Sequence, residues 1–288
     1  MTGTVSTLGR RLRDGVPLLP FFAVLTIFLL IPTVTVVVNA FVADGAFSLD
    51  RIEALFSATA LSALWKSVLL SGSTALIGAV LGALLSWLIV SSPPESMVRR
   101  AVLALCSVLA QFGGVALAFA FLATVGLNGV LTLWIQQALG WNLAGSGWLY
   151  SLSGLILVYT YFQIPLMVIV FVPALEGLRE QWREAAVNLG ASTWQYWREV
   201  GFPLLTPAFL GSLLLLFANA FAAYATAAAL VSQGSPIVPL LIRSALTSEV
   251  VLGQSGFAYA LALEMIVVVA LVMVAYNALV RRTARWLQ

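Results

Sequence analysis

The polar residues whose spacing could do chemistry gather in one short stretch, residues 184–203, which reads EAAVNLGASTWQYWREVGFP. The positions of interest are Glu184, Ala185, Ala186, Gly190, Val200 and Pro203. A lone carboxylate beside two alanines has no base or nucleophile to work with, so bond chemistry is not indicated. A polar, helix-forming segment between two long apolar stretches is instead suited to being held by a soluble partner.

The rest of the sequence offers no catalytic constellation either. It contains no histidine, which excludes histidine-based metal sites, catalytic triads and proton relays. Its one cysteine, Cys106, lies inside an apolar stretch, so neither a disulfide within the chain nor a thiolate metal site is expected. Glu264 is the one carboxylate inside an apolar stretch, and it has no acidic neighbour there. We therefore expect no enzyme activity and no metal or cofactor bound by this chain.

The elements that position residues 184–203 are expected to be membrane helices. The 288-residue chain is 61% hydrophobic and only 9% charged, whereas about 25% of the residues are charged in a typical soluble domain. Six apolar stretches each exceed the ~20 residues that cross a bilayer as a helix, and open sheets cannot lie in lipid. The stretches are 16–42, 67–90, 101–125, 149–174, 204–231 and 257–280. The sequence therefore predicts an all-α, polytopic bundle of six transmembrane helices in a single domain, 1–288.

Basic residues predict the direction of the six spans. Eleven arginines fall on one predicted side and three basic residues on the other, and the richer side is expected to be cytoplasmic. The first group is Arg10, Arg11, Arg13, Arg99, Arg100, Arg179, Arg183, Arg198, Arg281, Arg282 and Arg285, and the second is Arg51, Lys66 and Arg243. Both termini are therefore expected in the cytoplasm, and the run 16–42 is too long for a cleaved signal peptide. The uncharged outer loop 126–148 carries Trp134, Trp141 and Trp148, which fit an interfacial segment or an ordinary aromatic belt.

Local signals predict a helix, a glycine turn and a second helix within the cytoplasmic loop 175–203. The residues before Gly190 are mostly strong helix formers, and glycine can end a helix in the left-handed conformation. Ser192 and Gln195 have the spacing of a capping box, which starts a new helix. Pro203 stands at the entry of the fifth span, where proline is tolerated. Such a helix pair could transmit a rigid-body displacement to the next span. The alternative is an amphipathic loop helix that only covers the end of the bundle.

The same stretch resembles the EAA loop found in permeases of binding-protein-dependent ABC importers. That pattern is EAA, three residues, Gly, nine residues, Ile, one residue, Leu, Pro. Every fixed spacing is kept here, with Val200 in place of Ile and Phe202 in place of Leu. The resemblance implies the type I ABC importer permease fold and a coupling helix that docks on an ATPase. The coupling residues it implies are Glu184, Ala185, Ala186, Gly190, Val200 and Pro203.

The resemblance also implies partners and a location. ATP and magnesium would be bound by a separate dimer of ATP-binding cassette subunits, since no GxxxxGK[ST] motif occurs in this chain. A second permease subunit, expected to make a heterodimer, would complete the pathway, and an extracytoplasmic substrate-binding protein would deliver the solute. The chain would lie in a bacterial inner membrane. Its net charge of +3 follows from membrane topology, and no nucleic acid partner is expected.

Several apolar segments are similar to the permease subgroup that imports the polyamines spermidine and putrescine. These segments are 126–129, 159–165, 217–229 and 236–241. The resemblance implies a polyamine or another small solute, and the alternative is a permease for iron(III), thiamine, sulfate or phosphonate. A stand-alone secondary transporter is a more distant alternative, because such proteins commonly contain inverted repeats and no clear repeat occurs here.

Polar residues within the spans are the candidates for the solute pathway. They are Gln163, Asn219, Tyr224, Thr226 and Glu264. Glu264, placed in the outer half of the sixth span, could attract a cation or could pair with another helix or a partner chain. One carboxylate matches a polycation poorly, so aromatic faces such as Tyr224 would have to contribute.

Helix geometry adds detail to these candidates. Gln163 precedes Pro165, which frees a backbone carbonyl in the fourth span that could line a cavity. Asn219 and Thr226 are seven residues apart and are expected to share one face of the fifth span. For every polar candidate the alternative is a hydrogen bond between helices. The pair Gly113–Gly114 is expected to serve close helix packing, as are Gly72, Gly78 and Gly82.

Overall fold

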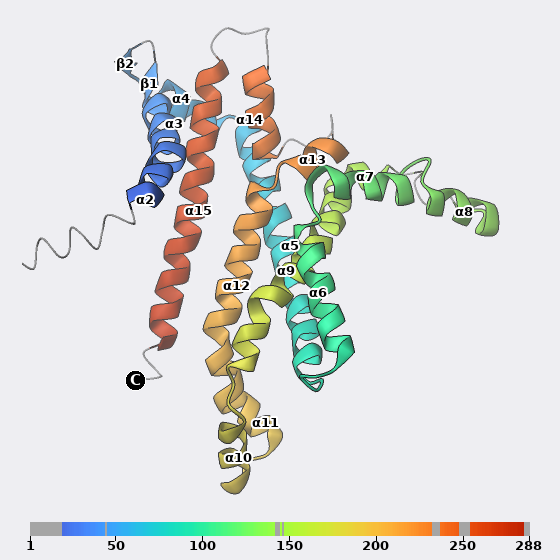
Figure 1. Cartoon of the computed structure of the whole chain (residues 1–288). Helices are drawn as coiled ribbons and strands as arrows, with labels where there is room; N and C mark the ends of the chain where they lie inside the picture. The colour runs from blue at the N-terminus through green and yellow to red at the C-terminus, as the bar shows by residue number, and fades with distance from the viewer. Residues whose placement is uncertain are drawn as a thin grey trace, which may run out of the picture.

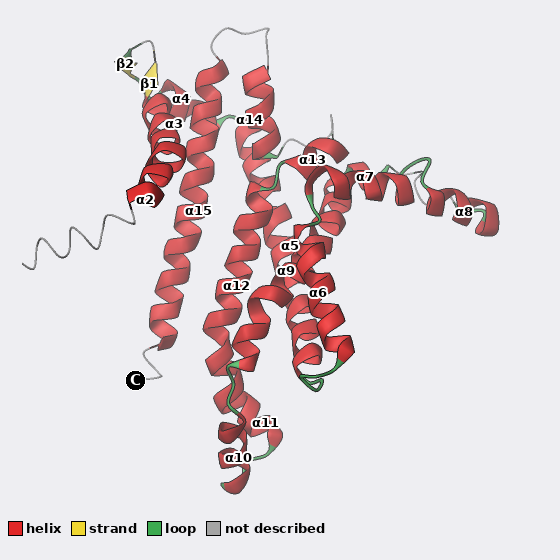
Figure 2. Cartoon of the chain, viewed as in Figure 1, coloured by secondary structure: helices red, strands yellow, loops and turns green. Residues whose placement is uncertain are grey.

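The computed structural model describes residues 19–43, 45–141, 145, 147–231, 237–247 and 254–284. The described chain is helical apart from connecting loops and one short hairpin (Figure 2). In the hairpin, β1 (Val42–Ala43) pairs antiparallel with β2 (Ala46–Phe47). The predictions for Arg10, Arg11, Arg13, Arg285 and Pro236 fall outside the described residues.

The helices and helical turns of the described residues have the following bounds, in chain order. The first half contains α2 (Leu19–Leu25), a π-helical turn (Thr26–Leu30), α3 (Ile31–Phe41), α4 (Asp50–Glu53), a 3-10 turn (Ala54–Phe56), α5 (Ala58–Val90), α6 (Met97–Gln111), α7 (Gly114–Val125) and α8 (Val130–Leu139). The second half contains a 3-10 turn (Trp148–Tyr150), α9 (Leu152–Glu176), α10 (Glu180–Asn188), α11 (Thr193–Tyr196), a π-helical turn (Trp197–Gly201), α12 (Phe202–Ala222), α13 (Ala225–Leu230), α14 (Val238–Thr247) and α15 (Gln254–Ala284).

Six stretches of helix in the described residues are long and apolar enough to cross a membrane, which confirms the predicted fold class. They are Leu19–Phe41, Ala58–Val90, Gly114–Leu139, Leu152–Glu176, Thr193–Ala222 and Gly256–Ala278. The ends differ from the predicted ranges, most of all in the third span, which is Gly114–Leu139 rather than 101–125. The second span begins at Ala58 rather than at residue 67. Ser57 starts this helix by accepting a hydrogen bond from the Ala60 amide.

Two predicted spans are broken, which corrects the expectation of continuous helices over 101–125 and 204–231. In the first, α6 ends at Gln111 and α7 begins at Gly114, whose φ of +67° lies in the left-handed region that favours glycine. A Cβ on Gly113 would meet nothing within 4 Å, so the prediction that this pair serves close packing was wrong. In the second, α12 ends at Ala222 and α13 begins at Ala225.

The centre of the bundle is formed by α5, α9 and α12, which pack closely on one another. Glycine permits this approach: a Cβ on Gly78 would lie 2.6 Å from the Cβ of Gln163, and one on Gly82 would lie 2.5 Å from the Cβ of Met167. Packing of small residues is the usual source of helix association where water exerts no hydrophobic drive. The expectation of close packing is therefore confirmed for these two glycines, but it was wrong for Gly72, where a Cβ would meet nothing within 4 Å.

The bundle has two distinct ends (Figure 1). Helices α10 and α11 and the α5–α6 connection lie at the lower end in this view, whereas the β hairpin, α4 and the upper end of α14 lie at the opposite end. Helices α7 and α8 extend sideways from the bundle near that upper end. Arg99, Arg183 and Arg198 belong to the lower elements and Arg51 belongs to an upper one, as the predicted charge asymmetry requires.

Candidate functional site

The lower end carries a helix pair that we call the docking segment, residues 180–201. Helix α10 is followed by Gly190, whose φ of +81° makes the sharp turn, and a Cβ there would meet nothing within 4 Å. The turn is closed by a 2.9 Å hydrogen bond from the Ala191 amide to the Ala186 carbonyl. The observed helix, glycine turn and helix agree with the local prediction.

The second helix of the docking segment begins with the predicted capping box. The Ser192 amide donates to Gln195 Oε1 at 2.7 Å, and the Gln195 amide donates to Ser192 Oγ at 3.3 Å. Both bonds satisfy amides that a helix start leaves without partners. The start of α11 is therefore set by two side chains within the segment itself.

The outer face of α10 is exposed and partly apolar. Helix α10 buries none of its residues, and Glu184 and Ala185 are exposed while Ala186 is half-buried. Val187 and Leu189 are 61% and 87% exposed. Val187 lines the same hollow as Glu184, and Leu189 follows the last residue of α10. Sequence reasoning missed these two residues, although they stand between the EAA triplet and the glycine. This end of the docking segment therefore exposes both aliphatic and charged side chains.

A shallow hollow of about 300 Å³ lies beside this face. Its lining consists of Glu180, Arg183, Glu184, Val187 and Asn188. Glu180 Oε1 and Arg183 Nη1 are 3.4 Å apart and both side chains are exposed, so their ion pair adds little stability. The hollow thus offers carboxylate, guanidinium and amide groups next to an aliphatic side chain.

The docking segment is continuous with the bundle through α12. Tyr196 and Gly201 are buried, and the π-helical turn Trp197–Gly201 leads into α12 without an intervening loop. A Cβ on Gly201 would lie 2.5 Å from the Trp197 ring, so the indole packs directly on this turn. Val200 is half-buried, and Pro203 is the second residue of α12. A displacement of α11 must therefore move the lower end of α12 with it.

The two broken helices meet at a second hollow, of about 250 Å³. Its lining residues are Ala110, Gly113, Gly114, Phe162, Asn219, Ala223, Tyr224, Ala225 and Thr226. Two hydrogen bonds hold the breaks in place: Thr226 Oγ1 donates to the Gly114 carbonyl at 3.2 Å, and the Tyr159 hydroxyl donates to the Ala223 carbonyl at 2.6 Å. The two helix breaks, which are distant in sequence, thus lie side by side.

Three of the five pathway candidates, Asn219, Tyr224 and Thr226, come together at this hollow. The structural cause of their proximity differs from the predicted cause. Asn219 and Thr226 were expected to share a face of one continuous helix, but the helix ends between them and α13 starts anew at Ala225. Their proximity follows from the break, which the periodicity of the sequence did not reveal.

Gln163 and Glu264 lie elsewhere. Gln163 is fully buried and its Nε2 donates to the Leu216 carbonyl at 2.7 Å, so it joins α9 to α12. Its Oε1 has no hydrogen-bond partner among the described residues. Glu264 is half-buried on α15, which packs on α3, α12 and α14, and its Oε2 likewise lacks a partner in the described part of the chain. Neither residue lines the hollow.

The chemistry available at the hollow is hydrogen bonding. None of the described lining residues carries a charge; the polar groups are an amide, a phenol and a hydroxyl. Within the described chain, no group of three or more His, Cys, Asp or Glu side chains is placed to hold a metal ion. These polar groups could form hydrogen bonds to a small solute.

Comparison with known proteins places this architecture in context. No model of a protein family matches the chain. The chain is 29% identical over 192 residues to the sulfate transport system permease protein CysW of Escherichia coli (strain K12), covering 67% of this chain and 62% of that protein. It is 29% identical over 129 residues to the thiamine transport system permease protein ThiP of Salmonella typhimurium (strain LT2), covering 44% of this chain and 23% of that protein. The chain therefore spans less than two thirds of these relatives.

Two solved structures align with nearly the whole length of this chain. A crystal structure of a bacterial ABC transporter involved in the import of the acidic polysaccharide alginate aligns with a TM-score of 0.74 at 18% identity, covering 96% of this chain and 99% of that chain. A structure of a bacterial alginate ABC transporter in complex with an alginate pentasaccharide-bound periplasmic protein aligns with a TM-score of 0.72 at 20% identity, covering 96% of each chain.

The fold and the comparisons together define a class. The chain is a multi-pass membrane protein with the type I fold of ABC transporter permeases, as the EAA-like stretch predicted. The curated relatives named above are permease proteins of a sulfate and of a thiamine transport system. Their names do not support the polyamine subgroup to which the apolar segments were similar.

Proposed function

We propose that this chain is the membrane-spanning permease subunit of an ATP-driven ABC importer. One observation carries the proposal: an exposed helix pair at one end of the bundle, the docking segment, is continuous with α12, and α12 ends at the hollow lined by Asn219 and Tyr224. A displacement of the docking segment would therefore be transmitted to the hollow through one helix, α12. ATP and magnesium would be bound by a separate pair of ATPase subunits.

The docking segment would bind the ATPase mainly through shape and apolar contact. Burial of apolar surface contributes about 25 cal/mol per Å², and Val187 and Leu189 supply such surface. Ala185 and Ala186 would permit close approach, and Glu184 would meet a basic or polar group. An exposed ion pair contributes only ~0–1 kcal/mol, so Glu184 would select the binding orientation more than it would strengthen binding.

The importer would contain more than this chain. A second permease subunit would supply the other half of the pathway, and an extracytoplasmic binding protein would deliver the solute. The alginate transporter complex with its periplasmic protein supports this arrangement by analogy of fold. The membrane would be a bacterial inner membrane with both termini in the cytoplasm.

The solute that we propose is a small one of the kind named for the relatives, sulfate or thiamine. No group lining the hollow favours iron(III) or phosphonate over these two. A polyamine would need carboxylates to balance its positive charges, and none of the described residues lining the hollow is acidic. The hydrogen-bonding groups of Asn219, Tyr224 and Thr226 suit a polar solute whose selection rests largely with the binding protein.

Gentle purification of the chain from its native membrane, followed by mass spectrometry, tests the proposal. We expect an ATPase, a second six-span permease and a binding protein to travel with it. Vesicles containing the complex should take up labelled sulfate or thiamine only when ATP is supplied. A chain that is purified alone and moves either solute without ATP would instead be a secondary transporter, and the proposal would be wrong.

A further inference from the structure

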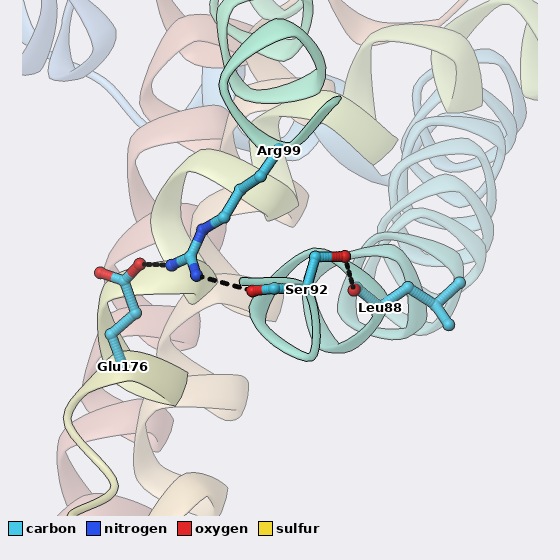
Figure 3. A network of polar contacts seen from close by, with 4 residues as sticks. All are labelled: Leu88, Ser92, Arg99 and Glu176. Atoms are coloured by element: carbon cyan, nitrogen blue, oxygen red, sulfur yellow. Dashed lines mark hydrogen bonds and ion pairs between the residues drawn. The ribbon is translucent and has the colours of Figure 1, made fainter. Parts of the chain in front are cut away.

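One ion pair ties three helix ends together next to the docking segment (Figure 3). The Arg99 guanidinium, in the first turn of α6, donates to the carboxylate of Glu176, the last residue of α9. It also donates to the Ser92 carbonyl at 3.2 Å, and Ser92 Oγ donates to the Leu88 carbonyl in the last turn of α5 at 3.3 Å. The ends of α5, α6 and α9 are thus joined through one side chain.

The position of these charges is unfavourable for each helix alone. The start of a helix carries partial positive charge and its end partial negative charge, yet Arg99 lies at a helix start and Glu176 at a helix end. Each charge is compensated by the other rather than by its own helix. The Arg99 side chain is only 10% exposed, whereas Glu176 is 47% exposed. This arrangement is explained by a contact between helices, not by stabilisation of either helix.

The ion pair lies at the connection from which α10 departs. Only three residues separate Glu176 from Glu180, where α10 begins. Because α10 buries none of its residues, its position is set largely by the chain on either side of it. A hollow of about 350 Å³ is lined both by the ends of α5 and α9, including Trp87 and Leu175, and by the docking segment, including Tyr196. Holding Glu176 therefore holds the near end of α10.

We propose that Arg99 and Glu176 are positioning residues that form a second mechanical connection from the docking segment to the hollow. This inference rests on the proposed function. The first connection runs from α11 through α12 to the break at Ala223. The second runs from α10 through the end of α9 and the ion pair to α6, which packs on α9 and ends at the break before Gly114.

The two connections end on opposite sides of the same hollow, at the two breaks that Thr226 and Gly114 join by a hydrogen bond. If only α12 moved, it would pull Thr226 away from Gly114, which follows a stationary α6. With the ion pair intact, α6 and α12 receive the displacement together and the hollow changes shape in a defined way. Loss of the pair should therefore weaken the link between ATP hydrolysis and the hollow, while the docking segment still holds the ATPase.

A charge-swap experiment on the native complex tests this. Arg99→Glu, Glu176→Arg and the double swap are compared with Arg100→Glu, a matched control. Arg100 is exposed, is the next residue of α6, and has no side-chain hydrogen bond or ion pair among those found in the described chain. The milder variants Arg99→Lys and Glu176→Gln serve if a reversal fails to assemble; lysine cannot reproduce the forked donor geometry of Arg99.

Two quantities are measured in membrane vesicles. One is ATP hydrolysis by the ATPase that travels with the chain. The other is the rate at which a membrane-impermeant maleimide labels an Ala225→Cys reporter, with and without ATP and magnesium; Ala225 lines the hollow and is small. We expect each single reversal to keep the ATPase bound and active but to reduce the ATP-dependent change in labelling at least about fivefold, the lower end of typical coupling effects. The double swap should restore part of it, because it re-forms the ion pair between positions 99 and 176 but not the hydrogen bond to the Ser92 carbonyl. Arg100→Glu should behave as the native chain.

The outcomes separate the inference from the proposed function. If the native complex hydrolyses ATP and changes its labelling, but the single reversals do so equally well, the inference is wrong and the proposed function stands. The same holds if the double swap is no better than the single reversals. If no ATPase travels with the native chain, or ATP leaves its labelling unchanged, the proposed function fails and the inference fails with it.

Discussion

Gly190→Ala is the sharpest test of the docking segment. Gly190 has a φ of +81° and a Cβ at this position would meet nothing within 4 Å. The substitution therefore adds no clash, and its whole cost is that of placing an L-residue in the left-handed region, about 1–2 kcal/mol. A cost of this size changes a conformational population roughly 5- to 30-fold. Because α10 buries no residue, the cost should fall on the turn between α10 and α11 rather than on the bundle.

The assay is the amount of ATPase retained by the purified chain, together with its hydrolysis rate. We expect Gly190→Ala to lower retention severalfold without lowering the thermal stability of the chain in detergent. Gly45→Ala is the matched control, since Gly45 has a φ of +80°, equal free space, and a position in the β hairpin at the opposite end. Gly190→Asn should restore retention, because asparagine tolerates this conformation better than alanine. Equal effects of Gly190→Ala and Gly45→Ala would refute the assignment of the docking segment.

Three further substitutions probe other parts of the structure. Gly78→Ala would place a Cβ 2.6 Å from a side-chain carbon of α9, so it should destabilise the bundle by about 1–3 kcal/mol, whereas Gly72→Ala meets nothing within 4 Å and should leave thermal stability in detergent unchanged. Tyr159→Phe removes the 2.6 Å hydrogen bond to the Ala223 carbonyl; a loss of about 1 kcal/mol should appear as faster maleimide labelling of an Ala225→Cys reporter, and unchanged labelling would show that this bond does not hold the break. Glu184→Lys should lower ATPase retention while the chain still inserts and folds, and full retention with normal hydrolysis would count against Glu184 as a docking residue.

Features that depend on composition and on residues close together in the chain could be predicted from the sequence. Runs of more than ~20 apolar residues have to be helical in lipid, so the six-span, all-α class followed directly. The turn at Gly190 and the capping box of Ser192 and Gln195 were also predictable, because each depends on residues within a few positions of one another. The roles of Glu184 and its neighbours at the interface remain predictions, since no partner chain tests them.

The positions of the helix breaks, and the residues that these breaks bring together at the hollow, became known from the tertiary structure alone. An average of hydropathy over a span cannot show that α6 ends before Gly114 or that α12 ends before Ala223, because apolar residues stand on both sides of each break. Whether a polar side chain joins helices or faces a hollow depends on a neighbour far away in sequence. Gln163 meets the Leu216 carbonyl, while Thr226 meets Gly114 beside the hollow. These contacts form because close packing of the helices brings distant backbone carbonyls within hydrogen-bond distance of the side chains. The periodicity of apolar residues along one helix does not indicate which distant carbonyl that will be.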